Sequence, residues 1–473
     1  MARRLNLRAS CLALLAVVSG LTALPARSQP SPQLTPAQMH GDLAYLRDKI
    51  VVQDSNPWLY TSKADFDRLY SRLDGQLNRP MNRLDFYRHA ARLAASLRDG
   101  HTLVDPLIGD FQAYAQTGGV LPVEVSFIDG RLYVAANASG DNHLKSGVEI
   151  TAINGRSIAA IVGDYRGLIN DVHPLYDIYA RLFREMYWMS YGAPPTFRIA
   201  WRDGRTHGVA TVPAHVYPAD AFHSYLPGGL PYAFTRLPDG TGLMTINSFA
   251  PSDGFAAFLD QSFAELADTG AETLIIDVRK NGGGSGRLAQ DTVSYLTDKP
   301  YAQIGAFYVK VTDDLKALYA RGDTHTDEDT KRLVMDNPSG ALVDGLKDSG
   351  PIVITPPHRD HVFHGKLFLL TANNTFSAAA MFTAYVKCNA LGKVVGQAPG
   401  QATNFVADAV PFTLPSSGLT FNVSFSEIHM PCEQNYTQGI SPDFPLSPSP
   451  GSLASGKDEV LDYALSLAHI PAS

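Results

Sequence analysis

A serine between a buried strand and a helix is the first candidate for chemistry in this chain. Residues 366–372 are almost all apolar and are long enough for one buried strand. Polar residues 373–375 form a turn, and residues 378–388 have the composition and apolar period of a helix. Ser377 therefore lies at a helix N-terminus, where free N–H groups and the helix dipole favour a developing negative charge. An acyl-transfer nucleophile occupies such a position, although a helix-capping serine has the same local sequence.

His101 is a second candidate, because an imidazole can accept the proton that a serine nucleophile loses. It lies in an Asp-Gly-His-Thr turn, between a helical pattern that ends at Leu97 and the apolar pair 103–104. A tight turn lets the ring project, although histidines in such turns often have only structural roles. The long sequence separation from Ser377 is no obstacle, since catalytic groups are defined by geometry.

A glycine loop, residues 279–286, follows an apolar strand pattern that ends at Val278. Adjacent glycines let the backbone approach a substrate carbonyl and offer it an N–H, so this is a candidate oxyanion loop. A plain turn has the same spacing. The segment 284–289 also matches a dinucleotide fingerprint, but its first glycine comes six positions after the strand end instead of at the turn. We therefore expect no nucleotide cofactor.

The N-terminal part combines an expected export signal with a helical domain. Residues 1–28 have a basic start, a short apolar stretch and a small-residue cleavage site, and the apolar stretch is too short to span a bilayer. Pro-, Ser- and Gln-rich residues 29–40 predict a disordered lead. Apolar spacing predicts three helices in a domain over 29–115, at 43–50, 62–77 and 84–97.

Two further domains are predicted after the helices. Hairpin signals at 129–130 and 203–204 indicate a β-rich module over residues 116–215, and modules of this kind often take an extended peptide along a strand edge. Strands and helices alternate over 216–473, which predicts an α/β domain with a largely parallel sheet. Charged residues 311–349 predict an excursion over this core, such as a lid.

The charge balance excludes one class of partner. The chain has 39 Lys+Arg and 46 Asp+Glu, and loss of residues 1–28 removes four arginines and no acid. The remaining net charge of about −11, without a basic stripe, argues against a nucleic-acid partner. No later segment has the length and purity of a transmembrane helix. Cys388 and Cys432 either form a disulfide or remain as two buried thiols.

Six segments resemble, in order, the tail-specific or C-terminal processing family of serine peptidases. They read LRDGHT (97–102), LKSGVEITAINGRSI (144–158), TLIIDVRKNGGGSG (273–286), KLFLLTANNTFSAAAMFTAYVK (366–387), GKVVGQAPG (392–400) and GISPDFPL (439–446). The resemblance covers nearly the whole chain after residue 28. It implies an α/β core with a crotonase-like or ClpP-like fold, an N-terminal helical domain and an inserted, PDZ-like β-rich module.

Carried over residue by residue, the resemblance implies that Ser377 is the nucleophile. It also implies that the N–H of Ala378 and that of Gly282 or Gly283 form the oxyanion hole. Each of these groups lies in one of the two matching core segments.

The chain departs from the family's best-known branch, which pairs its serine with a downstream lysine. Here position 402 is alanine and its neighbour is Gln401, while Lys387 and Lys393 come too early in the sequence. The tricorn-like and nisin-resistance-like branches instead use a histidine from the helical domain. The resemblance to these branches implies that His101 is the general base.

A third residue that orients His101 is left open by the sequence. Tricorn-like relatives use a glutamate near the C-terminus, and Glu427 and Glu433 are candidates, but neither aligns cleanly with the family position. Asp99, two residues before the histidine, is a further candidate.

Two other polar groups are set aside. Three histidines, at 358, 361 and 364, have odd spacings that face opposite sides of a strand, so we expect no metal site. Asp277 and Arg279, at a strand end, are expected to pair and to organise the glycine loop.

The sequence thus predicts an exported, periplasmic or extracellular, serine peptidase that acts on a peptide or protein substrate without a cofactor. The alternative is a binding protein for a ligand or peptide on the same fold, since some members of the resembled family, such as retinoid carriers, bind apolar ligands. A crotonase-like acyl-CoA enzyme fits the core but not the export signal or the β-rich module.

Overall fold

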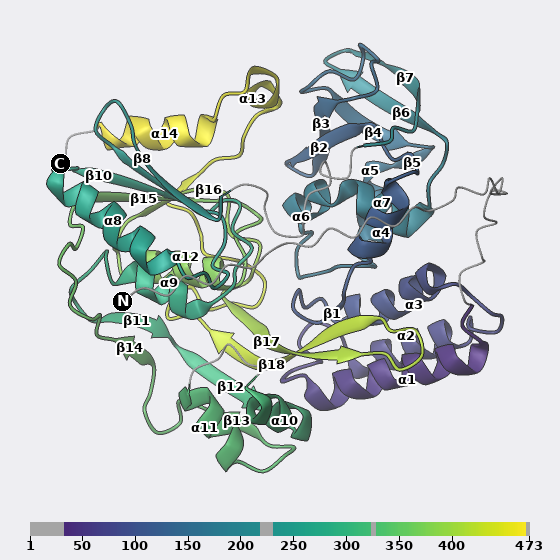
Figure 1. Ribbon diagram of the computed structural model, residues 1–473, viewed down its shortest axis with the longest axis horizontal. Coiled ribbons are helices and arrows are strands. Elements are labelled where there is room, and N and C mark those ends of the chain that lie inside the picture. Colours follow the sequence, from purple (N-terminus) through teal and green to yellow (C-terminus); the bar gives the residue numbers. More distant parts are fainter. Residues whose placement is uncertain (1–32, 218–229, 323–327, 470–473) are drawn as a thin grey trace, which may run out of the picture.

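The computed structural model of the protein describes residues 33–217, 230–322 and 328–469; the expected export signal lies outside them. The fold is mixed α/β with several sheets. Figure 1 shows the N-terminal helices, the β-rich module and a sheet covered by helices, arranged around two long strands, β17 and β18.

The predicted N-terminal helices are confirmed as α1 (Pro36–Gln53), α2 (Lys63–Asp74) and α3 (Arg83–Ala95). Each begins with a side-chain cap, from Thr35, Ser62 and Asn82 in turn. The prediction of a disordered lead is wrong from Pro36 onward. Thr35 and Gln38 form a capping box with Pro36 in the first turn, so α1 begins earlier than its apolar pattern suggests.

The β-rich module contains a six-stranded sheet in the order β2-β3-β4-β6-β7, with β5 paired to β4, so that β2 is an edge strand. Its strands are β2 (Val123–Ile128), β3 (Arg131–Asn137), β4 (Glu149–Ile153), β5 (Arg156–Ser157), β6 (Thr196–Asp203) and β7 (Thr206–Pro213). Its helices are α5 (Ile158–Tyr165), α6 (Tyr176–Arg181) and α7 (Phe183–Tyr191), and α4 (Ile108–Ala115) precedes it. Helix α6 packs against β2.

The predicted parallel sheet is confirmed in the second half of the chain. Its order is β19-β16-β15-β10-β9-β8, and the neighbours from β9 to β19 are parallel while β8 is an antiparallel edge. These strands are β8 (Tyr232–Arg236), β9 (Gly242–Ile246), β10 (Thr273–Asp277), β15 (Lys366–Thr371), β16 (Lys393–Gly396) and β19 (Phe444–Pro445). Helices α8 (Phe255–Asp268), α9 (Gly286–Val293) and α12 (Ala378–Cys388) cover one face, and α14 (Glu459–Ala468), which follows α13 (Pro450–Ser455), covers the other (Figure 1).

A second sheet joins the two halves of the chain. Its order is β1-β18-β12-β13, with β17 on β18, and a separate pair is formed by β11 and β14. The strands are β1 (Leu103–Val104), β11 (Tyr301–Ile304), β12 (Ala306–Lys310), β13 (Leu342–Asp344), β14 (Ile352–Ile354), β17 (Asn404–Thr413) and β18 (Thr420–His429). Because β1 pairs with β18, the turn that carries His101 is brought to the C-terminal half of the chain.

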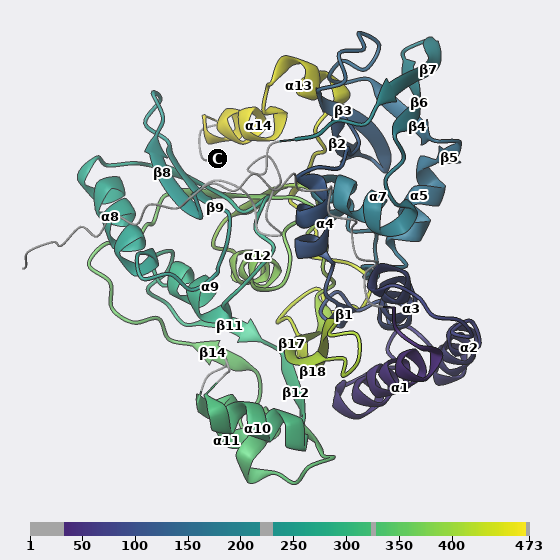
Figure 2. The ribbon, with the colours of Figure 1, turned by 45° about the vertical axis from the view of Figure 1, so that its right-hand side comes forward.

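The charged excursion forms α10 (Asp313–Arg321) and α11 (Glu328–Asp336). Its apolar side chains pack against Val410 of β17 and Phe425 of β18, and Lys49 of α1 pairs with Asp314 at 2.5 Å. Figure 2 shows these helices at the end of the second sheet, away from the module. The excursion therefore extends this sheet instead of covering the parallel one.

Two further features link the parts. One hydrophobic cluster includes residues of the N-terminal helices, residues of the module and Phe376, next to Ser377. A disulfide between Cys388 and Cys432 ties the end of α12 to the segment after β18, which settles the alternative left open by the sequence. Within the described residues, no helix combines the length and apolar character needed to cross a bilayer.

Candidate active site

Ser377 has the backbone of a sharp strand-to-helix turn. Strand β15 ends at Thr371, α12 begins at Ala378, and Ser377 between them has φ 50° and ψ −126°. Its side chain makes no helix-capping hydrogen bond, so the capping alternative is wrong. A positive φ is costly for a residue with a Cβ, and such turns are found where a side chain must project from the backbone.

The structure brings His101 to Ser377. The His101 Nε2 and Ser377 Oγ atoms are 3.2 Å apart, within hydrogen-bond distance. The His101 ring lies between Phe376 and Phe405, with ring centroids at 5.2 and 6.3 Å. The two groups that the sequence placed in different domains therefore form one pair, in a position from which the imidazole can accept the hydroxyl proton.

Asp99 is the candidate acid that lies beside His101. Its Oδ1 is 3.7 Å from His101 Nδ1, an ion-pair distance, and accepts a hydrogen bond from the His101 backbone N–H at 2.9 Å. Its Oδ2 accepts from the hydroxyl of Ser424 on β18 at 2.6 Å. Asp99 is therefore held on both oxygens in a buried position next to the imidazole.

The other two candidate acids point elsewhere. Glu427 accepts hydrogen bonds from Asn56, His429 and Tyr436 at 3.0, 2.8 and 2.9 Å. Glu433 is exposed and accepts from the backbone N–H of Ser441 at 2.9 Å. Neither forms an ion pair with His101 among the described contacts.

Buried acids set the electrostatics of the pair. Burial alone would lower the pKa of His101, but the carboxylates of Asp99, Asp171 and Asp408 together raise it. Burial opposes ionisation of Asp99 too, yet His101, Ser424 and Thr102 lower its pKa below the usual value. Asp99 is therefore the ionised partner of the imidazole at neutral pH.

Two neighbouring carboxyl groups have pKa values that are raised instead of lowered. Burial and repulsion from Asp99 raise the pKa of Asp171 to about 7. The same two causes raise the pKa of Asp54 well above its ordinary value. Asp99 is thus the most acidic of these three carboxyl groups.

The glycine loop lies against Ser377. A Cβ added to Gly283, whose φ is +110°, would be 2.5 Å from the Ser377 Cβ and 3.2 Å from the Ala378 nitrogen. Buried Asn281 ties the two loops together: its backbone oxygen accepts from Phe376 N–H at 3.1 Å, and its side chain accepts from Gly283 N–H at 2.9 Å. Only a residue without a side chain can occupy position 283.

The three backbone amides predicted as oxyanion donors differ in their hydrogen bonds. The Gly283 amide is engaged by Asn281, as described above. Over the described part of the chain, the amides of Gly282 and Ala378 have no hydrogen-bond acceptor. Both remain able to donate to a substrate oxygen.

The side chains near the expected lysine position take structural roles. Gln401, 2% exposed, accepts the backbone N–H of Ser377 on its Oε1 at 2.6 Å. Lys387 and Lys393 instead pair with Asp443 at 3.0 and 3.5 Å. No lysine pairs with Ser377 among the described contacts, and Gln401 supports the strained serine backbone.

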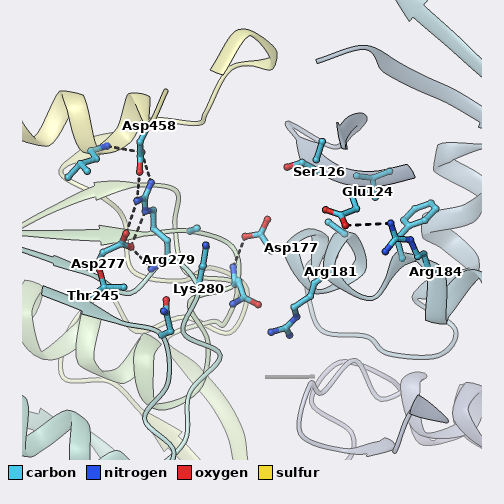
Figure 3. A pocket seen from close by; sticks show the side chains of 18 of the residues that line it. Glu124, Ser126, Asp177, Arg181, Arg184, Thr245, Asp277, Arg279, Lys280 and Asp458 are labelled. Carbon is cyan, nitrogen blue, oxygen red and sulfur yellow. Dashed lines mark hydrogen bonds and ion pairs between the residues drawn. The ribbon is translucent and has the colours of Figure 1, made fainter. Parts of the chain in front are cut away.

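A cleft of about 1040 Å³ lies between the module and the parallel sheet (Figure 3). Its module side includes residues 123–126 of edge strand β2 and Asp177 of α6. Its core side includes Lys280 of the glycine loop and Asn374, three residues before Ser377. The cleft thus borders both loops of the candidate site.

The remaining polar groups of the sequence analysis have structural positions. Arg279 pairs with Asp277 and with Asp458 at the start of α14, each at 2.6 Å, as Figure 3 shows. This confirms the predicted pairing and ties the end of β10 to α14. His358 lies 3.8 Å from Asp360 at the surface. In the described ranges, no group of three or more His, Cys, Asp or Glu side chains could hold a metal ion.

Three residues near the pair were not singled out by the sequence. Ser424 holds Asp99, Asn281 joins the two core loops, and Asp171 accepts the N–H of Gly100 at 3.0 Å. Asn281 could have been noted as the residue directly before the run of glycines. The other two lie in unremarkable local sequence and become neighbours only through tertiary contacts.

Comparisons with known proteins bear on the family and the fold. Residues 240–446 match the model of Peptidase family S41. The fold is similar to that of mature CPAF complexed with lactacystin (TM-score 0.62, 17% identity, covering 92% of this chain and 98% of that chain). It is also similar to a mutant of CPAF (TM-score 0.63, 17% identity, covering 93% and 99%). No curated protein matches the chain. The match over residues 240–446 identifies the chain as a serine-type peptidase.

Proposed function

We propose that the protein is an exported serine peptidase that hydrolyses peptide bonds through an acyl-enzyme at Ser377, with His101 as general base. This Ser/His assignment corresponds to the tricorn-like and nisin-resistance-like branches of the family. The observation that carries it is the 3.2 Å contact between His101 Nε2 and Ser377 Oγ. Asp99 is the residue that we assign to orient the imidazole and to stabilise its charged form.

In the first step, Ser377 Oγ attacks the scissile carbonyl carbon while His101 Nε2 takes the hydroxyl proton. The tetrahedral intermediate collapses, the C–N bond breaks, and the imidazolium gives its proton to the leaving amine. Water then attacks the acyl-enzyme, and the same imidazole takes a proton from the water and returns one to Ser377. The raised pKa of His101 makes the imidazole a stronger base than it is in water.

We assign the amides of Ala378 and Gly282 to the oxyanion hole. Ala378 begins α12, so its amide also has the positive end of the helix dipole. Gly282 is preferred to Gly283 because the Gly283 amide already donates to Asn281.

The cleft supports a peptide or protein as the substrate. The free edge of β2 can add an extended peptide strand, and the cleft leads from that edge to the turn before Ser377. We therefore propose that the module is PDZ-like, that it sits on a core of crotonase-like or ClpP-like fold, and that it presents the peptide chain to the site.

Export is supported by the pattern of residues 1–28 and by the Cys388–Cys432 disulfide, which is expected in an oxidising compartment. Mass spectrometry of the protein from the producing cell's periplasm or medium tests this proposal. A chain that begins after residue 28 is expected, and a chain retained in the cytoplasm with residues 1–28 would contradict it.

Labelling with a fluorophosphonate probe tests the catalytic assignment. The wild-type protein should become labelled at Ser377 and should cleave members of a mixed-sequence peptide library. Ser377→Ala should lose both probe labelling and peptide cleavage, and His101→Ala should slow both by at least about 10³-fold. Both variants should still show the thermal unfolding transition of a folded protein. Full cleavage by either variant would contradict the assignment. A wild-type protein that binds peptides without being labelled would favour the alternative of a binding protein.

A further inference from the structure

A segment of the β-rich module touches both loops of the candidate site. Asp171 Oδ2 accepts the backbone N–H of Gly100, the residue before His101, at 3.0 Å. Six residues later, Asp177 Oδ2 accepts the backbone N–H of Asn374, three residues before Ser377, at 2.9 Å. The two carboxylates thus reach from one short stretch of the module to the backbones on either side of the pair.

Asp171 is buried and packs tightly against Gly100. Asp171 is 6% exposed, and its second oxygen accepts the N–H of Val172 at 2.6 Å. A Cβ added to Gly100 would lie 2.7 Å from Asp171 Oδ2 and 2.6 Å from the ring of Phe376. The module, the histidine turn and the serine loop therefore meet at Gly100.

Two further hydrogen bonds attach the same segment to the end of α3 and to the turn that carries His101. Asn170 donates to the backbone oxygen of Ala95 at 3.1 Å, and Arg98 donates to the backbone oxygen of Val172 at 3.1 Å. The turn therefore depends on the module for its position relative to α3.

We propose that Asp171 and Asp177 are positioning residues, which hold the His101 and Ser377 loops in register from the module. The inference rests on the proposed function, since it assigns how that site keeps its geometry. Proton transfer needs the two heavy atoms within hydrogen-bond reach, and a displacement of about 1 Å can cost about 10²-fold in rate. Asp177 also lies in the wall of the cleft, facing the core (Figure 3).

The test compares two loss variants with a conservative one. In Asp171→Asn, the side-chain amide nitrogen must face one of the two backbone N–H groups that now donate to the Asp171 carboxylate. Asp177→Ala removes the acceptor for Asn374, whereas Asp177→Asn retains an oxygen for it. Asp164→Asn is the matched control, because Asp164 accepts from Tyr191 within the module and touches neither loop.

The substrate is the library peptide that the wild-type protein cleaves fastest. Asp171→Asn should lower kcat about 10- to 100-fold, and Asp177→Ala about 10-fold, with KM within about twofold. Fluorophosphonate labelling should slow in parallel and still reach one probe per chain. Asp177→Asn should recover most of the lost kcat. Asp171→Asn should also move the acid limb of kcat/KM to lower pH, because it removes one of the carboxylates (Asp99, Asp171 and Asp408) that raise the pKa of His101.

Wild-type kcat in both loss variants would overturn the proposal, as would an equal loss in Asp164→Asn or no recovery in Asp177→Asn. If Asp171→Asn fails to fold, the comparison of kcat between Asp177→Ala and Asp177→Asn tests the proposal instead. A wild-type protein that neither cleaves nor reacts with the probe would contradict the proposed function itself, which separates that failure from failure of the positioning roles alone.

Discussion

The loop that carries Ser377 is held mainly by groups that follow strands of the parallel sheet, whereas the turn that carries His101 is held by groups from two distant parts of the chain. On the serine side, Asn281 and Gln401 bind the backbone next to the nucleophile. On the histidine side, Ser424 of β18 and Asp171 of the module hold the turn. The first geometry comes mainly from the parallel-sheet domain, with one contact from Asp177 of the module, whereas the second depends on how several parts pack.

This difference has a consequence for mutation. A change on the serine side should act through steric fit and backbone strain, because the serine lies in a crowded loop with a positive φ. A change on the histidine side should act through charge and orientation, and should therefore also alter the pH dependence. The following variants probe these two sides.

Gly283→Ala should have the largest effect. Its Cβ would lie 2.5 Å from the Ser377 Cβ, and the φ of +110° is unfavourable for alanine. We expect kcat/KM to fall about 10³-fold, comparable to the loss of an oxyanion donor. Gly286→Ala, in the same loop, is the control for peptide-cleavage assays and should remain active, because its Cβ would meet only Met381 Cε at 3.9 Å, an ordinary contact. Equal activity in the two variants would show that the loop does not constrain the serine.

Asp99→Asn should lower kcat about 10²-fold, less than in a triad with a full hydrogen bond, because Asp99 lies 3.7 Å from the imidazole. Only the neutral imidazole accepts a proton, so kcat/KM rises as the pH rises through the His101 pKa. Asp99 raises that pKa, so its neutralisation should shift the acid limb to lower pH. A pH–rate profile measures both effects. Glu433→Gln should leave the profile unchanged, and a shift in that control with none in Asp99→Asn would reverse the assignment.

Gln401→Ala should have a smaller effect, about 10-fold on kcat, because it removes the acceptor of the Ser377 N–H without touching the reacting atoms. Steady-state kinetics with the same library peptide measure this loss. Gln397→Ala is the control, since the Gln397 side chain bonds Ser447 instead. A larger loss at position 397 would mean that Gln401 does not support the serine.

Replacement of both Cys388 and Cys432 by serine should have the smallest effect on activity, within about twofold, because neither sulfur contacts the pair. The closed loop spans 44 residues, so the free energy of unfolding should fall by up to about 4 kcal/mol. Denaturant unfolding with and without reductant checks this. An unchanged midpoint would mean that the disulfide adds no stability.

The local structure around Ser377 could be predicted from the sequence, whereas most contacts of the turn that carries His101 could not. The strand–turn–helix around Ser377 follows from apolar runs and turn residues, which are local signals. The proximity of His101 came from a family resemblance, and the choice among three acids needed the fold, because only tertiary packing separates Asp99 from Glu427.

Two other features were not predicted from local sequence patterns. Asp171 has no motif around it, and its contact with Gly100 joins residues that are 71 positions apart. The early start of α1 was missed because the Pro- and Gln-rich composition outweighed the capping box at Thr35.

His101 and Ser377 lie 276 positions apart in the sequence, and this separation bears on how the protein is made. The imidazole is synthesised early, the hydroxyl much later, and the β18 strand that docks the histidine turn later still. A growing chain therefore has no assembled pair until nearly all of it has emerged. The order of synthesis therefore delays formation of the His101–Ser377 pair until β18 has been made.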